Sequence, residues 1–332
     1  MLTTFNAYII INSCSIKCII FFFFMKLALI TSCTSRKRST TGVKPAVSQL
    51  KRGSCSAVAD QWTSLIAENK DRIPAGNLYA GRAALEIKKS ASLLNADLWF
   101  ISAGMGFVGA DQLIPSYDLT ISKGNPSYIG NKIASHPFNA REWWNSLDNG
   151  KSEEKIHSLF TKCNYDLVIL TCPTHYFNMI APSLEKLPQR KLSKLRIIGP
   201  KRDSIPDMFD SFVMPYDHRL NGPDSQNRGT QSDFAQRATH DFAKVIVSKI
   251  PKSNRHQHAQ LVHERLSQMD PPLQVIRRKK SDTEITDIIL ENWSSCNGRS
   301  AQSLRMLRDK NLVSCEQKRF SRLFNEIKMS KA

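Results

Sequence analysis

WFISAGMGFVGADQLIPSYD, residues 99–118, is the stretch of the chain that indicates its fold most directly. It begins as a short apolar strand, is interrupted by three glycines and ends in Pro115, Tyr117 and Asp118. A buried strand running into a glycine-rich loop is typical of open α/β sheets, which deliver polar groups to a cleft at the carboxyl ends of their strands. Because glycine lets the backbone approach a ligand closely, we expect a substrate site here. The expected contacts in this segment are Ser102, Gly104, Gly106, Phe107 and Tyr117.

Apolar runs alternate with helix-like stretches around that segment. Strands are expected at 27–31, 98–102, 167–172, 195–198 and 212–214, and helices at 49–69, 79–94, 140–160 and 232–249. Strands that alternate with helices predict a mostly parallel sheet flanked by helices. The expected fold class is therefore α/β over residues 25–250, and we expect any catalytic site to lie in this domain.

The two ends of the chain differ from this pattern. Residues 1–24 hold apolar runs broken by polar residues, which indicates either a mis-assigned start, with the working protein beginning at Met25, or a weak apolar leader. Residues 251–281 are expected to form a basic helix and linker. Short helices at 282–293, 300–310 and 315–328, with Ser300 as an N-cap, predict a small helical bundle of the helix-turn-helix type over 282–332.

The 332 residues carry a net charge of +18, which predicts attraction to a polyanion. Nucleic acid is the leading candidate, ahead of an acidic membrane surface. The C-terminal bundle concentrates cations, and DNA contacts are expected from Arg305, Arg308, Lys318, Arg319 and Arg322. The alternative is a solvated basic face with no ligand.

Cysteine and histidine patterns indicate neither disulfides nor a metal. The eight cysteines form no CxxC pair, which indicates a reducing, cytoplasmic setting without structural disulfides. The apolar runs of residues 1–24 are too short for a membrane span, so no stable membrane association is expected. His256, His258 and His263 have no cysteine or carboxylate at zinc-ligand spacing, so a solvated helix face is expected there. No metal and no organic cofactor is expected.

The loop at 32–38 follows the first strand and carries both hydroxyl and cationic side chains. Loops at this end of an α/β sheet are the ones that bind ligands. Ser32, Cys33, Lys37 and Arg38 suit phosphate, although a charged strand-to-helix turn has the same composition. The loop lacks the glycines and the GK[ST] ending of a P-loop, which argues against nucleoside triphosphate hydrolysis.

Three carboxylates follow predicted strands. Asp118 is the first candidate for a catalytic carboxylate, Asp111 the second, and Asp217 a rival at another strand end. Aspartate often caps a following turn, and spacing alone favours that role for Asp111 and Asp118. The loop after the third strand adds His175, Tyr176 and Asn178, which can protonate or read a base.

These residues form a series that resembles a known family. Ser32-Cys33 with Lys37, Leu78-Tyr79 with Gly81, and residues 99–118 resemble, in order, a small bacterial and phage α/β family with an S-C-x-x-x-K start and a W-F-I-S-A-x-x-G-F-V core. The family is linked to DNA modification and phage defence, and it is similar to anti-phage DNA glycosylases with a uracil-DNA-glycosylase-like fold. The resemblance covers about residues 25–198.

The resemblance implies a DNA glycosylase that flips a modified base of phage DNA and leaves an abasic site. No aspartate stands at 32–38, where uracil glycosylases carry their water-activating acid, so the catalytic role moves to Asp118. Tyr79, Phe107 or Tyr176 would then stack on the base, and His175 or Asn178 would read it. A nucleobase or nucleotide transferase of DNA or RNA modification, and a non-catalytic DNA-binding ligand sensor, remain as alternatives.

Overall fold

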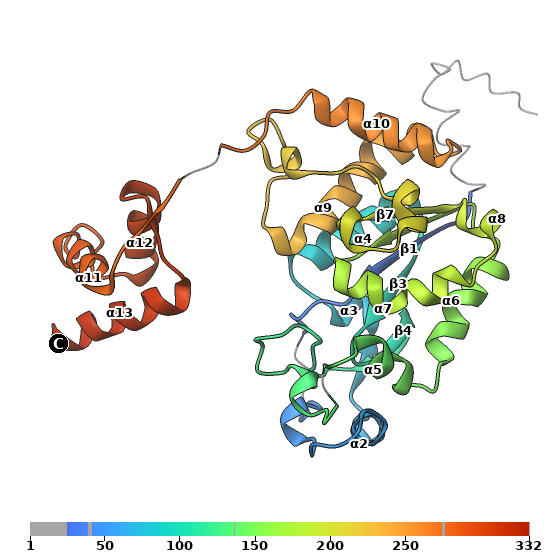
Figure 1. Ribbon diagram of the computed structural model, residues 1–332, viewed down its shortest axis with the longest axis horizontal. Helices are drawn as coiled ribbons and strands as arrows, with labels where there is room; N and C mark the ends of the chain where they lie inside the picture. The colour runs from blue at the N-terminus through green and yellow to red at the C-terminus, as the bar shows by residue number, and fades with distance from the viewer. Residues whose placement is uncertain (1–24, 39–41, 136, 274–275, 332) are drawn as a thin grey trace, which may run out of the picture. The chain divides into compact units, whose positions relative to one another are not determined.

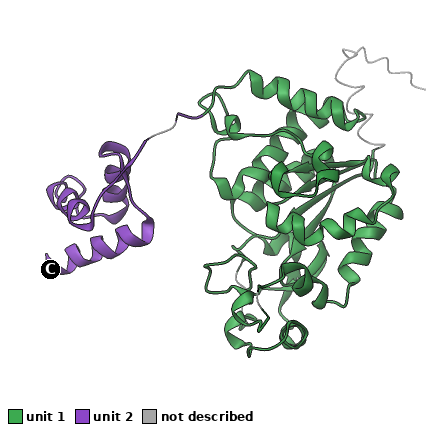
Figure 2. Cartoon of the chain, viewed as in Figure 1, with its two compact units in different colours: residues 1–271 green, residues 272–332 purple. Residues whose placement is uncertain are grey.

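A computed structural model describes residues 25–38, 42–135, 137–273 and 276–331. The expectation about residues 1–24 lies outside these ranges. The chain divides into two compact units, residues 1–271 and residues 272–332 (Figure 2). Residues 251–271, within the segment expected to be a basic helix and linker, are part of the first unit and include a helix at Arg255–Ser267.

The first unit is built on a five-stranded sheet with the order β4-β3-β1-β6-β7 (Figure 1). Its strands are β1 (Leu27–Ser32), β3 (Asp97–Ser102), β4 (Gly106–Gly109), β6 (Leu167–Thr171) and β7 (Leu195–Ile198). All neighbours are parallel except β4, which runs antiparallel to β3. A separate antiparallel ribbon pairs β2 (Arg72–Pro74) with β5 (Leu113–Pro115). The expected α/β class with a mostly parallel sheet is confirmed.

Helices cover both faces of the sheet because alternate strand residues enter two different cores. On β1, Ala28 and Ile30 belong to one core, whereas Leu27 and Leu29 belong to the other. The first core is shared by α2 (Cys55–Glu68), α5 (Ala140–Ser146), α6 (Lys151–Thr161) and α7 (Thr174–Glu185). The second core is shared by α4 (Arg82–Leu94), α9 (Phe234–Asp241) and α10 (Arg255–Ser267), and α4 packs along α9 (Figure 1).

Shorter segments complete the first unit. They are α3 (Ala75–Leu78), α8 (Gln189–Leu192), a π-type continuation of α9 (Phe242–Val247), and 3-10 turns at Val47–Gln49, Ile129–Asn131, Arg202–Ser204, Asp207–Phe212, His218–Asn221 and Gln231–Asp233. None of the helices in the described part of the chain has the length and apolar character that a membrane crossing requires.

Three sequence predictions in this unit were wrong in detail. The single helix at 140–160 is two helices, because Asn149 and Gly150 take left-handed conformations with φ of 52° and 80°. The strand at 212–214 follows a 3-10 turn and makes a single bridge, Val213 to Ile197. Residues 106–109, expected in a glycine-rich loop, form the edge strand β4, where Trp99 of β3 stacks on Phe107.

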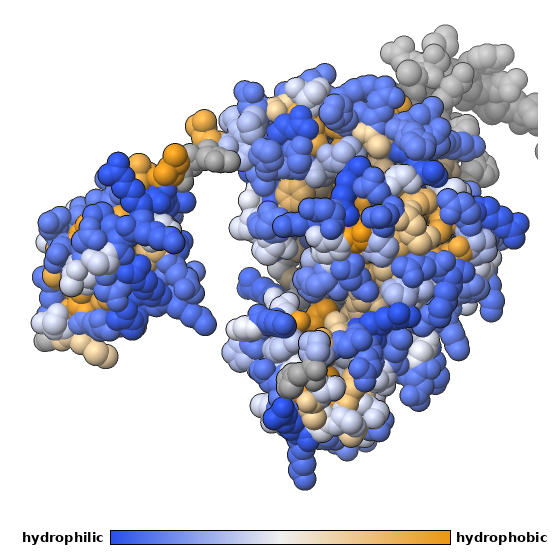
Figure 3. Space-filling model, in the orientation of Figure 1, coloured by the Kyte–Doolittle hydropathy of each residue, from blue (hydrophilic) through white to orange (hydrophobic). Residues whose placement is uncertain are grey.

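The described residues of the second unit form three α-helices and a core of their own. Its elements are β8 (Arg278–Lys279), α11 (Asp282–Glu291), α12 (Ser300–Arg305), a π-type turn at Met306–Lys310, β9 (Val313–Ser314) and α13 (Gln317–Ser330). Ile289, Leu307, Phe320 and Phe324 are among the residues of that core. Ser300 is the first helical residue rather than the N-cap, which is Arg299 without a side-chain cap. Hydrophilic side chains cover most of the visible face of both units (Figure 3).

Candidate active site at the carboxyl edge of the sheet

The loops after β1 and β6 meet where the strand order reverses. β1 leads to β3 on one side of the sheet, and β6 leads to β7 on the other. A crevice forms outside the carboxyl ends of the strands at such a switch point. Here Cys33 Sγ lies 3.2 Å from the hydroxyl oxygen of Tyr176, in the first turn of α7. Two residues expected at the substrate site are thus in contact.

A chain of buried hydroxyl groups continues from this contact. The hydroxyl oxygens of Tyr79 and Tyr117 are 3.0 Å apart, and Tyr117 lies 2.6 Å from Ser102 Oγ. The backbone N–H groups of Gly104 and Met105 donate to the same Ser102 Oγ. Burial, reinforced by the nearby Cys33, raises the pKa of Tyr79 and Tyr117. Both phenols are therefore neutral hydrogen-bonding groups at physiological pH.

Three tryptophans hold the turn that follows β3. The indole N–H groups of Trp62, Trp143 and Trp144 donate to the carbonyls of Gly104, Ala103 and Ser102 at 2.7, 2.8 and 3.1 Å. All three rings are fully buried, so each indole N–H requires a partner. None of the three was expected at the site from the sequence, in which their only signal is tryptophan within predicted helices.

Lys37 adds a basic side chain to the cluster. Its Nζ lies 4.1 Å from the centroid of the Tyr117 ring, and its backbone bridges that of Tyr79. Burial lowers the pKa of Lys37, Cys33 and Asp118 oppose this shift, and Lys44 adds to it. We call Cys33, Lys37, Tyr79, Ser102, Tyr117 and Tyr176 the carboxyl-edge cluster.

Asp118 borders this cluster with an accessible carboxylate. Its side chain is 46% exposed and pairs with Lys44 at 3.8 Å. Its backbone is held on both sides, because Asp118 N–H donates to Pro45 and Val47 N–H donates to Asp118. Among the described residues no backbone N–H donates to the carboxylate, so it does not cap the following turn.

The structure separates Asp118 from the other two candidate carboxylates. Because β4 runs antiparallel, Asp111 lies beyond its end, near the start of β3, where Ala110 N–H donates to Leu98. Asp111 is exposed there. Asp217 caps a 3-10 turn and accepts hydrogen bonds from the Arg219 guanidinium at both carboxylate oxygens. Burial alone would raise the pKa of Asp217, but the hydrogen bonds from Arg219 lower it.

Gly106 and Phe107 are packing residues at this edge. Gly106 has a φ of +71°, and a Cβ there would lie 2.2 Å from Ser152 Oγ. Phe107 is fully buried and stacks on Trp99 with centroids 5.2 Å apart. Neither Phe107 nor the equally buried Tyr79 presents a ring surface on which a base could stack.

The remaining predicted substrate residues flank the cluster. Ser32 is the buried last residue of β1. The His175 ring lies 4.9 Å from that of Tyr176, and partial burial lowers the pKa of His175. Asn178, one turn further along α7, donates through Nδ2 to the Ser204 carbonyl at 3.0 Å.

A basic pocket of about 530 Å³ lies beside the cluster and shares Lys37 and Tyr79 with it. It is lined by Arg36, Lys37, Arg38, Tyr79, Ala80, Gly81, Arg82, Ala84, Leu85 and Lys88. None of the described residues that line it is acidic, and α4 begins there without a side-chain cap. Neither Arg36 nor Arg38 pairs with a carboxylate of the described residues. Such a pocket favours an anionic ligand.

The five predicted DNA contacts of the second unit fall into two groups. Arg308 donates to the Cys315 carbonyl, Arg319 binds Asp282, and Arg322 binds Asp282 and Glu326. Arg305 and Lys318 have no ion-pair partner within the described ranges, and Arg305 lines a second pocket of about 640 Å³ with Arg277 and Arg308. Only Arg305 and Lys318 of these predicted DNA contacts are thus free of internal pairing in the part of the unit that is described.

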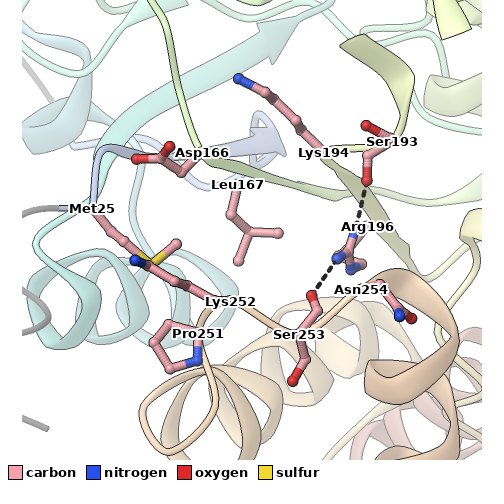
Figure 4. Close-up of a pocket in the computed structure, with 10 residues that line it drawn as sticks. All are labelled: Met25, Asp166, Leu167, Ser193, Lys194, Arg196, Pro251, Lys252, Ser253 and Asn254. Carbon is pink, nitrogen blue, oxygen red and sulfur yellow. Dashed lines mark hydrogen bonds between the residues drawn. The ribbon is translucent and has the colours of Figure 1, made fainter. Parts of the chain in front are cut away.

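The opposite edge of the sheet has a cavity of about 460 Å³ that is organised by structural hydrogen bonds (Figure 4). Buried Arg196 donates there to the carbonyls of Ser193 and Ser253, and through Nε to His258 Nδ1. The expectation of a solvated face was wrong for His258, which is fully buried.

Among the described residues no group of His, Cys, Asp and Glu is arranged to hold a metal ion.

Comparison with known proteins adds no family: no protein-family model and no curated protein matches the chain.

Proposed function

We propose that this protein is a DNA glycosylase that hydrolyses the N-glycosidic bond of a flipped base and leaves an abasic site. The observation that carries the proposal is the accessible Asp118 carboxylate beside the carboxyl-edge cluster and the basic pocket. A carboxylate of this kind stabilises the cationic sugar of the transition state and orients the attacking water. The water oxygen bonds to C1′, and the base leaves with the bonding electron pair.

The basic pocket supports the DNA part of the proposal. A base must leave the duplex before its glycosidic bond is reachable, at a cost of a few kcal/mol that contacts to the strand must offset. Arg36 and Arg38 supply cations without carboxylate partners among the described residues, which suits the phosphates of the flipped nucleotide. His175 and Asn178 flank the cluster from α7 and would read the base. No metal or organic cofactor enters this reaction.

The finer features of the proposal rest on the family resemblance and on charge. They are a uracil-DNA-glycosylase-like form of the α/β fold, a modified base in phage DNA as substrate, a cytoplasmic location, and a helix-turn-helix role for the second unit. The second unit holds 13 Lys and Arg against 7 Asp and Glu over residues 272–332, which supports sequence-tolerant affinity for DNA.

Base release from DNA tests the proposal directly. The full-length protein is incubated with phage DNA that carries modified bases and with unmodified DNA. Free base is measured by mass spectrometry, and abasic sites by strand breakage in hot alkali. Asp118→Asn should slow base release about 10²–10⁴-fold, the usual contribution of an acid–base carboxylate. Asp111→Asn is the matched control, because Asp111 is exposed at the other edge, and it should retain full activity. If no DNA yields free base, the protein is not a glycosylase.

A transferase is the second candidate, favoured by the Cys33 thiol at the switch point. A thiol beside a lysine is a nucleophile that can hold C1′ covalently while one base is exchanged for another. Such an enzyme leaves no abasic site, and Cys33→Ser would abolish base exchange. DNA that incorporates a labelled free base, without alkali-labile sites, would favour this reaction over hydrolysis.

A further inference from the structure

Lys37 is placed differently from a solvated surface lysine. Its amino group is sheltered against the face of the Tyr117 ring, at 4.1 Å from the ring centroid. No carboxylate of the described residues lies within ion-pair distance of it, although Asp118 and Cys33 are close enough to influence its charge. The carboxylate of Asp118 pairs instead with Lys44.

This environment favours the neutral amine. Burial removes water from the ammonium form and lowers the pKa of Lys37, the charges of Cys33 and Asp118 oppose this shift, and the positive charge of Lys44 adds to it. A neutral lysine amine is a nucleophile that forms Schiff bases with aldehydes and ketones. The product of base removal is such an aldehyde, since an abasic deoxyribose opens to expose C1′.

We propose that Lys37 gives the protein a second activity, that of an abasic-site lyase. This inference rests on the proposed function only in that base removal would supply the abasic site. Lys37 Nζ adds to the C1′ aldehyde, and water leaves to form a protonated imine. Asp118 takes a proton from C2′, a C2′–C3′ double bond forms, and the C3′–O bond breaks. The phosphate leaves with that electron pair, and water then hydrolyses the imine to restore the amine.

The neighbouring arginines fit the leaving group of this reaction. The departing strand end is a phosphate, whose negative charge grows as the C3′–O bond breaks. Arg36 and Arg38 stand on either side of Lys37 in the sequence, line the basic pocket with it, and have no carboxylate partner among the described residues. The same stretch of chain therefore carries the nucleophile and cations for the leaving phosphate.

Borohydride trapping on preformed abasic DNA tests the lyase separately from the glycosylase. The full-length protein is mixed with a duplex that contains one abasic site, made beforehand, and sodium borohydride is added to reduce any imine. We expect a covalent protein–DNA adduct in which peptide mapping places the DNA on Lys37, and strand cleavage without alkali when borohydride is omitted. Because the abasic site is supplied, a failure of base removal has no effect on this result.

Variants of two neighbouring lysines complete the test. Lys37→Arg keeps a long basic side chain but has no Schiff-base chemistry, so adduct formation and lyase cleavage should fall at least about 100-fold while abasic DNA is still bound. Lys44→Arg, altered at the lysine that pairs with Asp118, should still form the adduct. The proposal is overturned if the wild-type protein gives no adduct, or if the mapped adduct lies on another residue.

Discussion

Single residues at the turn after β3 determine how closely the cluster is packed. Gly104 lies between two buried rings, and a Cβ on it would stand 2.8 Å from Tyr117 Cε2 and 3.2 Å from Trp62 Cζ2. Neither ring is at the end of a flexible side chain, and Trp62 is fixed by its hydrogen bond to the Gly104 carbonyl. Glycine is therefore required at this position by close approach rather than by backbone conformation.

Gly104→Ala should lower the free energy of unfolding by about 1–3 kcal/mol, the usual cost of overpacking a core. The displaced Tyr117 ring would also move away from Ser102 and Lys37, so base release and imine trapping should both weaken. Urea unfolding and the two assays measure these effects. Gly109→Ala is the control, because its Cβ would meet Trp99 at an ordinary 3.5 Å. Equal stability of the two variants would show that Gly104 is not tightly enclosed.

At the scale of elements, α10 is joined to β7 through a neutral histidine. His258 Nδ1 accepts from Arg196 Nε at 2.9 Å, and His258 Nε2 lies 3.0 Å from the Ile250 carbonyl. Protonation of His258 Nδ1 would place its N–H donor opposite the N–H donor of Arg196 Nε. Burial, together with the charge of Arg196, lowers the pKa of His258 from 6.5 to about 4, although the Ile250 carbonyl favours the charged form.

This lowered pKa predicts a dependence of stability on pH. Between pH 6.5 and pH 4 the unfolded chain binds a proton at His258 that the folded chain does not. The contribution of His258 to stability therefore falls as the pH falls, by about 2 kcal/mol from pH 7.5 to pH 5. Urea unfolding of His258→Gln should show a pH dependence weaker by that amount. His263→Gln, altered at an exposed histidine of the same helix, should retain the wild-type dependence, and identical curves for all three proteins would contradict the prediction.

At the scale of the whole molecule, the net charge is +18, and the lysines and arginines behind it are of two kinds: some form ion pairs within the protein and others do not. In the second unit Arg319 and Arg322 form ion pairs, whereas Arg305 and Lys318 have none among the described residues. Arginines held by Asp282 contribute less to a polyanion contact, because part of their charge is already compensated. Of the five DNA contacts predicted in this unit, Arg305 and Lys318 should therefore contribute most to its salt-dependent affinity.

Arg305→Gln with Lys318→Gln should weaken binding to unmodified duplex DNA at every sequence tested. If both side chains contact phosphates, the slope of log affinity against log salt should fall in magnitude by about 2. Fluorescence anisotropy over a series of salt concentrations measures the slope. Lys162→Gln with Lys249→Gln removes the same charge from exposed positions of the first unit. An equal loss in both double variants would show that net charge alone, and not these two residues, governs binding.

Much of the fold could be predicted from the sequence because its signals are local. Buried strands such as 27–31 and 167–172 are continuous apolar runs, and they appear in the structure as β1 and β6. The sequence also placed Cys33 and Tyr176 at the same edge, since Cys33 directly follows β1 and Tyr176 lies in the first turn of α7, just after the parallel strand β6. The short strand β4 was not predicted, because Gly-Phe-Val-Gly has the composition of a loop and becomes a strand only by pairing with β3.

The amino-acid sequence by itself determined the α/β class, the order of its strands along the chain and the loops that carry polar groups. Only the tertiary structure decided which of those groups meet. It placed Asp118 beside the carboxyl-edge cluster and Asp111 beyond the end of β4, and it sheltered Lys37 against Tyr117. The physical reason is distance along the chain. Hydrophobic periodicity is a pattern of neighbouring residues within one helix or strand. Burial, hydrogen-bond partners and pKa depend instead on residues far apart in the chain, such as Trp144 and Ser102.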